Sequence, residues 1–111
     1  MKKTIKNRWL AALRSDKYRQ GTEALRSGNT FCCLGVLCDL HAQATFVTWE
    51  YDEPTGRYSY LGETILLPLA VCEWAGIEAQ NPLALSVFLT THNDARGRSY
   101  KQIARLIDTH L

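Results

Sequence analysis

Apolar residues near the start of the chain recur at helical spacing. Ile5, Trp9 and Leu13 are four residues apart, which places them on one face of a helix. Thr4, just before them, is a residue type that caps helix N-termini. The pattern predicts a first helix over residues 4–14.

A second clear helix pattern lies towards the other end of the chain. Ile103 and Ile107 belong to an apolar stripe, and Ser99 followed three residues later by Gln102 makes a capping box. These residues predict a last helix over 99–110, with its apolar face on the core.

The segment after residue 32 is too apolar for a helix that lies on the surface. Leu34, Val36 and Leu37 lie within a few positions of one another, which is typical of a helix buried on most sides. Gly35, inside this run, lets a neighbouring segment approach closely, at a cost of about 1 kcal/mol relative to alanine. We therefore expect a central buried helix over 33–44.

The rest of the chain predicts two hairpins and a third helix. Turn residues interrupt β-type segments at 24–32 and again at 46–61. A helix over 68–76 would begin with proline and end with glycine, as helices often do. The run 85–89 fits either a strand or a helical turn. These elements predict an α+β fold of about four helices with a small antiparallel sheet built from hairpins.

Length and composition indicate one domain. A chain of 111 residues, 46% apolar and 22% charged, has the composition of a folded protein rather than of a disordered one. A domain of this size buries roughly two-thirds of its unfolded surface, so it needs no disulfide or metal to fold. We expect a single globular domain over 1–111 and no cofactor.

No segment predicts export or membrane insertion. The longest apolar run, 65–72, has eight residues and includes a proline, so it is much too short to cross a bilayer. The basic start lacks the apolar stretch and the cleavage site of a signal peptide. We therefore expect a cytoplasmic protein with free thiols at Cys32, Cys33, Cys38 and Cys72.

The net charge of +2 hides an uneven distribution. Residues 1–31 carry eight Lys or Arg against two acidic residues, whereas residues 32–78 carry one against seven. Oppositely charged segments of this kind attract one another across a fold. Because no basic stripe with interleaved aromatics emerges, the distribution argues against nucleic acid as a partner.

The cysteines allow two chemical interpretations. Cys38 and His41 lie on one helical face, but no C-x-x-C pair completes a zinc site, so we expect no metal. A cysteine-dependent hydrolase or transferase would pair Cys32 or Cys33 with His92 as the base, yet no surrounding signature selects that pairing. Since their neighbours are apolar, the cysteines also fit as small core residues.

The segment before the last helix gathers the most polar chemistry in the chain. A helix N-terminus carries unpaired N–H groups and a partial positive charge, and arginines can bind phosphate through two N–H groups at once. Turn formation and helix capping explain most of the same residues. The candidate ligand-binding residues here are His92, Asn93, Asp94, Arg96, Arg98 and Ser99.

The second hairpin holds more large rings than one face can bury. Its four large aromatic residues are Trp49, Tyr51, Tyr58 and Tyr60. Such rings either pack the sheet against the helices or stack on a planar ligand. On the second interpretation, Trp49 and Tyr58 are candidate ligand-binding residues as well.

Four stretches of the chain together carry a resemblance to a known family. They are RWLAALRS at 8–15, FCCLGVLCDL at 31–40, Leu67-Pro68 with WAGI at 74–77, and Asn93-Asp94 with SYKQIA at 99–104. The chain resembles, over nearly its whole length, a family of small proteins common in bacteriophage and prophage genomes. Members often have a glycine soon after Asn-Asp, whereas Ala95-Arg96 precede Gly97 here. The resemblance implies a phage-borne accessory protein in the cytoplasm of a bacterial host, and no particular activity.

That context leads us to expect a non-enzymatic protein that inhibits a bacterial defence system. One mechanism is sequestration of a nucleotide-derived signal, with its phosphate on Arg96, Arg98 and the last helix, and a hairpin aromatic on its base. The other is direct binding of a defence protein through the charged and aromatic surface. The cysteine enzyme is the alternative function. A homodimer fits a chain of this size, although no residue pattern requires one.

Overall fold

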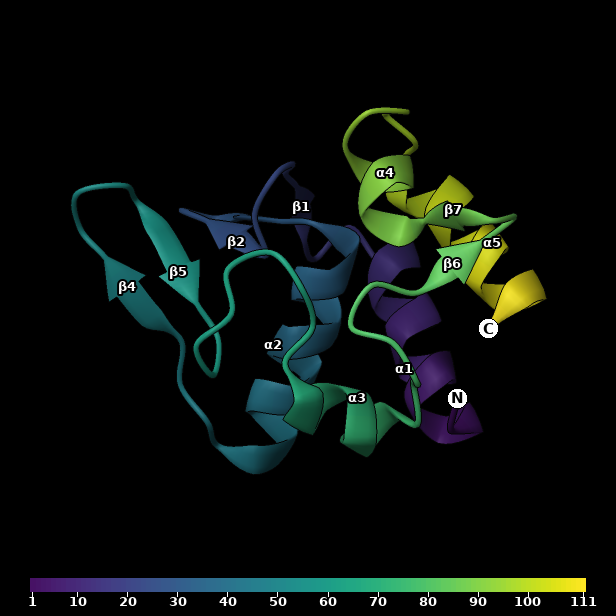
Figure 1. The fold of residues 1–111 in the computed structure, drawn as a ribbon, viewed down its shortest axis with the longest axis horizontal. Helices are drawn as coiled ribbons and strands as arrows, with labels where there is room; N and C mark the ends of the chain where they lie inside the picture. The colour runs from purple at the N-terminus through teal and green to yellow at the C-terminus, as the bar shows by residue number, and fades with distance from the viewer.

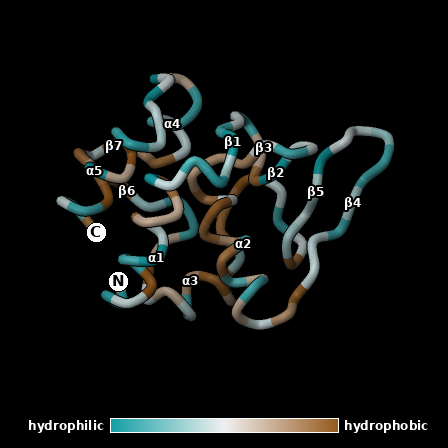
Figure 2. Tube along the Cα trace, turned by 180° about the vertical axis from the view of Figure 1, so that it is seen from behind, coloured by the Kyte–Doolittle hydropathy of each residue, from teal (hydrophilic) through white to brown (hydrophobic).

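Helix α2 (Cys33–Thr45) runs through the middle of the molecule in the computed structural model, which describes residues 1–111 (Figure 1). Every residue from Cys33 to Cys38 is buried, and Figure 2 shows hydrophobic residues along much of the helix. The prediction of a central buried helix over 33–44 is therefore confirmed, with its end one residue later.

Two contacts hold the start of α2 against its neighbours. The indole N–H of Trp9 donates a hydrogen bond of 2.9 Å to the carbonyl oxygen of Cys33. Gly35 faces the backbone of Leu25, and a Cβ atom on Gly35 would lie only 1.8 Å from the Leu25 carbonyl oxygen. The close approach expected at this glycine is present.

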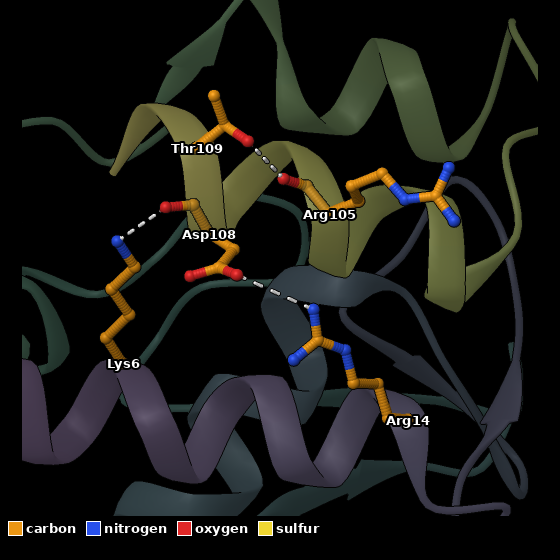
Figure 3. Close-up of polar contacts among 5 residues, drawn as sticks. All are labelled: Lys6, Arg14, Arg105, Asp108 and Thr109. Atoms are coloured by element: carbon orange, nitrogen blue, oxygen red, sulfur yellow. Dashed lines mark hydrogen bonds and ion pairs between the residues drawn. The ribbon is translucent and has the colours of Figure 1, made fainter.

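Helices α1 (Lys3–Arg14) and α5 (Tyr100–His110) lie against each other (Figure 3). The ammonium group of Lys6 donates to the backbone oxygen of Asp108 at 2.9 Å, and Arg14 forms an ion pair of 3.8 Å with the Asp108 carboxylate. Because both partners of the ion pair are about half exposed, it contributes only about 0–1 kcal/mol. The apolar stripes between the helices therefore supply most of the attraction.

The ends of these two helices test the capping predictions. The Ser99–Gln102 capping box is present, with both reciprocal hydrogen bonds. The predicted cap at Thr4 is wrong by two residues, because α1 begins at Lys3 and its N-cap, Lys2, makes no side-chain capping bond. Hydrophobic burial fixes α1 without a polar cap.

A five-stranded sheet lies beside α2, in the order β1-β3-β2-β5-β4 (Figure 1). Both predicted hairpins are present, with shorter strands than expected. Strand β1 pairs with β3 in parallel, so the sheet is mixed rather than purely antiparallel. The strands are β1 (Arg19–Gln20), β2 (Arg26–Ser27), β3 (Thr30–Phe31), β4 (Glu50–Asp52) and β5 (Arg57–Ser59).

Four short elements connect the sheet to the last helix. Helix α3 (Leu69–Ala75) follows Pro68 and ends at Gly76 in the left-handed conformation, as the sequence predicts. The 85–89 run begins in a hairpin turn between β6 (Leu83–Ala84) and β7 (Val87–Phe88), and it continues into α4 (Leu89–Asn93). Five helices and mixed sheets confirm the α+β class.

One cluster of buried residues joins all five helices to the sheet. Its largest fully buried members include Trp9, Tyr60, Leu25, Leu34, Leu37, Leu67, Leu89, Ile103 and Ile107. None of the helices is both long enough and apolar enough to cross a membrane.

His41 is a titratable group inside this packing. Its Nδ1 lies 2.6 Å from the hydroxyl of Tyr60, and its ring packs edge-on against Trp74 at 5.1 Å between centroids. Burial lowers the pKa of His41 below its ordinary value of 6.5. The unfolded chain therefore binds this proton more tightly than the folded chain does.

Acid is accordingly expected to destabilise the protein through His41. The contribution of neutral His41 to the free energy of unfolding is complete well above pH 6.5. It falls as the pH drops through that value towards the lower pKa of His41 in the folded state. The urea midpoint should therefore decrease between about pH 7.5 and about pH 5.5. A His41→Gln variant should lose most of this dependence. An equally steep profile in the variant would contradict the assignment to His41.

Candidate functional site

A groove of about 880 Å³ lies between α1, α2 and the near strands of the sheet. Residues one helical turn apart form its walls, and residues before α2 form its end. The α1 wall is Arg8, Ala11, Ala12 and Ser15; the α2 wall is Asp39, Leu40, Gln43 and Ala44; the end is Lys17, Tyr18, Arg26 and Phe31. We call this concavity the basic groove, because three cationic side chains and one carboxylate line it.

Small side chains explain why these two helices leave space between them. Ala11 and Ala12 on α1 and Ala44 on α2 line the groove, and their short side chains fill little of it. A concavity with cations at its rim is suited to a small anion.

Strand pairing places Arg26 in a row of aromatic side chains. Arg26 is the direct partner of Phe31 on β3 and of Tyr58 on β5, and Tyr58 in turn pairs with Tyr51 on β4. Direct partners in a sheet share a face. The guanidinium carbon of Arg26 lies 3.8 Å from the centre of the Tyr58 ring, 5.1 Å from Phe31 and 5.6 Å from Trp49.

Arg26 is held by rings rather than by an acid. Its Nε donates to the carbonyl oxygen of Gly28 at 3.2 Å, and it makes no ion pair, since the molecule's ion pair joins Arg14 and Asp108. Stacking on aromatic faces fixes the guanidinium plane while leaving its terminal N–H groups free to donate. Arg26 is therefore a cation whose orientation is fixed by its neighbours and which has no acidic partner.

Asp39, the one carboxylate in the groove, already has three donors. Its oxygens accept hydrogen bonds from the Tyr18 hydroxyl at 2.6 Å, the Gln43 amide at 3.0 Å and the Trp49 indole at 3.0 Å. Burial, together with the neighbouring Asp39 carboxylate, raises the pKa of Tyr18. Asp39 thus positions the ring of Trp49 and is not the counter-ion of Arg26.

A second concavity, of about 440 Å³, continues from the basic groove. Arg26, Asp39 and Gln43 line both spaces, so the two are contiguous. The other lining residues are Ala42, Phe46, Val47, Thr48, Trp49 and Tyr58. We call this space the aromatic slot; the basic groove and the aromatic slot together are the candidate site.

Comparison with known proteins identifies the family. A family model described as Domain of unknown function (DUF8296) matches residues 1–111, the whole chain. The chain belongs to the DUF8296 family. No match was found among curated proteins or among solved structures.

His92, which the sequence predicts as a ligand-binding residue, is fully buried in the DUF8296 domain. Its Nε2 lies 2.9 Å from the carbonyl oxygen of Ala84, which can only accept, and its Nδ1 accepts from the Nε of Arg98 at 3.2 Å. These two contacts fix the neutral tautomer with the proton on Nε2. Both ring nitrogens are thus already used within the fold.

Asn93, the next nominated residue, is the hub of a buried hydrogen-bond network. Its Oδ1 accepts from the backbone N–H of Cys33 at 3.1 Å and from the Gln20 amide at 3.0 Å. Its Nδ2 donates to the carbonyl oxygen of Gly21 and to the Asp94 carboxylate, both at 2.8 Å. Asn93 therefore joins α4 to the start of α2 and to β1.

The remaining nominated residues divide between two ends of the molecule. Arg98 is half-buried, whereas Arg96 and Ser99 are exposed, and Ser99 caps α5. The loop after α4 lies far from the hairpin that carries Trp49 and Tyr58 (Figure 1). The structure does not bring the loop and the hairpin rings to one site, so a ligand cannot contact both at once. Binding by either group stays a prediction.

The cysteines lie inside the core. All four are free and buried, and burial raises the pKa of the Cys32 thiol to about 11 and that of Cys33 well above its usual range. The Cys33 sulfur lies 3.8 Å from the carbonyl oxygen of Leu89, and neither thiol contacts His92. A thiolate nucleophile is disfavoured in such surroundings. No three His, Cys, Asp or Glu side chains form a group that could hold a metal ion.

Sequence reasoning missed the residues at the centre of the candidate site. Arg26, Asp39 and Gln43 were not nominated, although Asp39 was a visible anomaly as a carboxylate in an apolar helix. The pairing of β2 with β5, which brings Arg26 to Tyr58, joins segments that are not consecutive along the chain. No local pattern reveals that pairing.

Proposed function

We propose that this DUF8296 domain is a non-catalytic binding protein for a small ligand that carries both an anionic group and a planar ring. A nucleotide is the ligand class that fits this description. Its phosphate would lie in the basic groove and its base in the aromatic slot. The observation that carries the proposal is Arg26, which lines both spaces and has no carboxylate partner.

The charge of the basic groove supports the phosphate end. Arg8, Lys17 and Arg26 provide three cations within reach of one space. Arginine binds phosphate through two parallel N–H groups, and a guanidinium already fixed by rings loses little freedom on binding.

The aromatic slot supports the ring end. Trp49 and Tyr58 line the slot and are half-buried. Because the Arg26 guanidinium covers the Tyr58 ring at 3.8 Å, Trp49 and the plane of Arg26 are the surfaces on which a base would stack. Stacking on aromatic side chains and on arginine planes is a common mode of base recognition that tolerates different bases.

A bacterial role follows from the resemblance to phage and prophage proteins. In the cytoplasm of the host, a nucleotide binder would counter a defence system by sequestering a nucleotide-derived signal. The concavity of the basic groove supports this mechanism, whereas the aromatic slot is shallow and open to solvent, as a surface that covers a defence protein would be.

Replacement of Arg26 tests the anion site. An Arg26→Gln variant removes the charge and the paired N–H groups, so nucleotide affinity should fall by about tenfold or more. Binding would first be detected by thermal shift against linear and cyclic nucleotides, since a ligand at a hundredfold excess over Kd stabilises by about 2.7 kcal/mol. Calorimetry on the variant then gives the affinity change.

Arg57→Gln is the matched control, because Arg57 lies on the neighbouring strand β5, is exposed and lines neither space. It should bind as the wild type does. Equal losses of nucleotide affinity in both variants would indicate that the overall positive charge of the protein, rather than the groove, attracts the nucleotide. No shift with any nucleotide would contradict the proposed function.

A further inference from the structure

Phe46 combines two costly features at the end of α2. It adopts the left-handed conformation with φ of 62°, which most non-glycine residues avoid. The residue is 92% exposed, the largest exposed fraction among the large hydrophobic residues of the chain. Glycine would be the favoured residue at this helix C-terminus. The chain therefore carries an aromatic ring at a position where the left-handed backbone favours glycine and where water disfavours an apolar side chain.

The position of this ring connects it to the candidate site. Phe46 lines the aromatic slot together with Trp49 and Tyr58, while nearly all of its side chain faces solvent. It therefore lies at the rim of the slot.

We infer that Phe46 is a specificity-determining residue whose ring covers the outer face of a planar base held against Trp49, which lines the slot with it. The inference rests on the proposed function and deepens it, because it makes recognition of the ring separable from recognition of the phosphate. Arg26, Asp39 and Gln43 join the slot to the basic groove, so one ligand can occupy both spaces. The ligand class is a nucleoside phosphate rather than any small phosphate ester.

The test compares Phe46→Gly with Leu85→Gly. Leu85 is also left-handed, with φ of 54°, and 59% exposed, but it lies in the β6–β7 turn and lines neither the groove nor the slot. Glycine relieves the backbone strain at both positions, so both variants should fold and melt at or above the wild-type temperature. A loss of binding in one of them cannot then be attributed to unfolding.

Calorimetry with two kinds of probe reads out the role of the ring. The four common nucleoside 5′-monophosphates carry a base, and ribose 5-phosphate carries the same phosphate without one. Phe46→Gly should weaken the tightest nucleotide by about five- to tenfold and leave ribose 5-phosphate unchanged. Leu85→Gly should change neither, and Phe46→Tyr should keep nucleotide affinity within about twofold of the wild type.

The outcomes separate this inference from the proposed function. Equal affinity of the wild type for nucleotides and ribose 5-phosphate would overturn base selection while leaving the anion site in place. Unchanged nucleotide affinity in Phe46→Gly, or an equal loss for both kinds of probe, would overturn the role of Phe46 alone. Failure of the wild type to bind any of the five probes would overturn both.

Discussion

Alanine at position 35 is expected to cost more than about 4 kcal/mol of folding free energy, a range reached only when packing or backbone contacts are broken. The new Cβ would lie 1.8 Å from the Leu25 carbonyl oxygen and 2.7 Å from the carbonyl carbon. Backbone atoms on both sides must then move. The Leu25 backbone is held by hydrogen bonds to Thr64 at 2.7 Å and to Cys32 at 3.3 Å, so it has little freedom to do so.

Urea unfolding of Gly35→Ala and Gly97→Ala would check this expectation. Gly97 has φ of 58° and open space around its Cβ position, so alanine there meets only conformational strain of about 1–2 kcal/mol. Since native domains are stable by only about 5–15 kcal/mol, the Gly35 variant should be mostly unfolded or strongly destabilised. A cost at position 35 no larger than at position 97 would show that the two segments do not touch.

Loss of the Asn93 side chain is expected to destabilise the fold by about 3–5 kcal/mol, because several buried polar groups lose their partners together. Asn93→Ala removes the acceptor of the Cys33 backbone N–H and the side-chain donor to the Gly21 carbonyl. It also removes one of the two acceptors of the Gln20 amide, whose other acceptor is the Arg98 carbonyl oxygen. Each such group costs about 1–3 kcal/mol when it stays buried and unpaired.

A neighbouring exposed residue serves as the control for Asn93. Arg96→Ala should change stability by no more than about 0.5 kcal/mol, because Arg96 is exposed and its side chain makes no hydrogen bond within the chain. The same variant tests the polar loop as a binding site, since binding in the basic groove should survive it. Nucleotide binding that disappears in Arg96→Ala would place the site at the loop instead.

The helices could be predicted where burial and capping agree. The stripe of Ile103 and Ile107 with the capping box at Ser99 defines α5, and the dense apolar run around Gly35 defines α2. Both signals are local, because a helix satisfies its backbone within its own segment. Hydrophobic periodicity alone was enough for α1, although not for its first residue.

The strands were harder to predict than the helices, because their partners are distant along the chain or their turns have unusual sequences. The parallel partner of β1 is β3, and neither two-residue strand carries a pattern of its own. The β6–β7 turn uses Leu85 and Ser86 at positive φ, where Asn-Gly would have been recognised as a hairpin signal. Such a turn becomes visible only when the pairing is known.

Of the candidate site, only aromatic residues of the slot could be predicted from the sequence. Trp49 and Tyr58 were predicted because a short hairpin carried too many rings to bury. Arg26 and Asp39 became candidates only through the strand pairing and the packing of α1 on α2. Conversely, His92 and Asn93 looked like ligand-binding residues because buried structural networks use the same polar groups as binding sites do.

The Asn93 hub also sets the moment at which a newly made chain can finish folding. Cys33 and Asn93 are 60 positions apart, and Gln20 and Tyr100 are 80 apart. A ribosome that adds about 5–20 residues per second needs about 3–12 seconds to translate the segment from Cys33 on α2 to Asn93. Until Asn93 emerges, the nascent α2 has an uncapped start and no C-terminal helix against α1. The start of α2 therefore cannot gain its buried hydrogen-bond partner before Asn93 has left the ribosome.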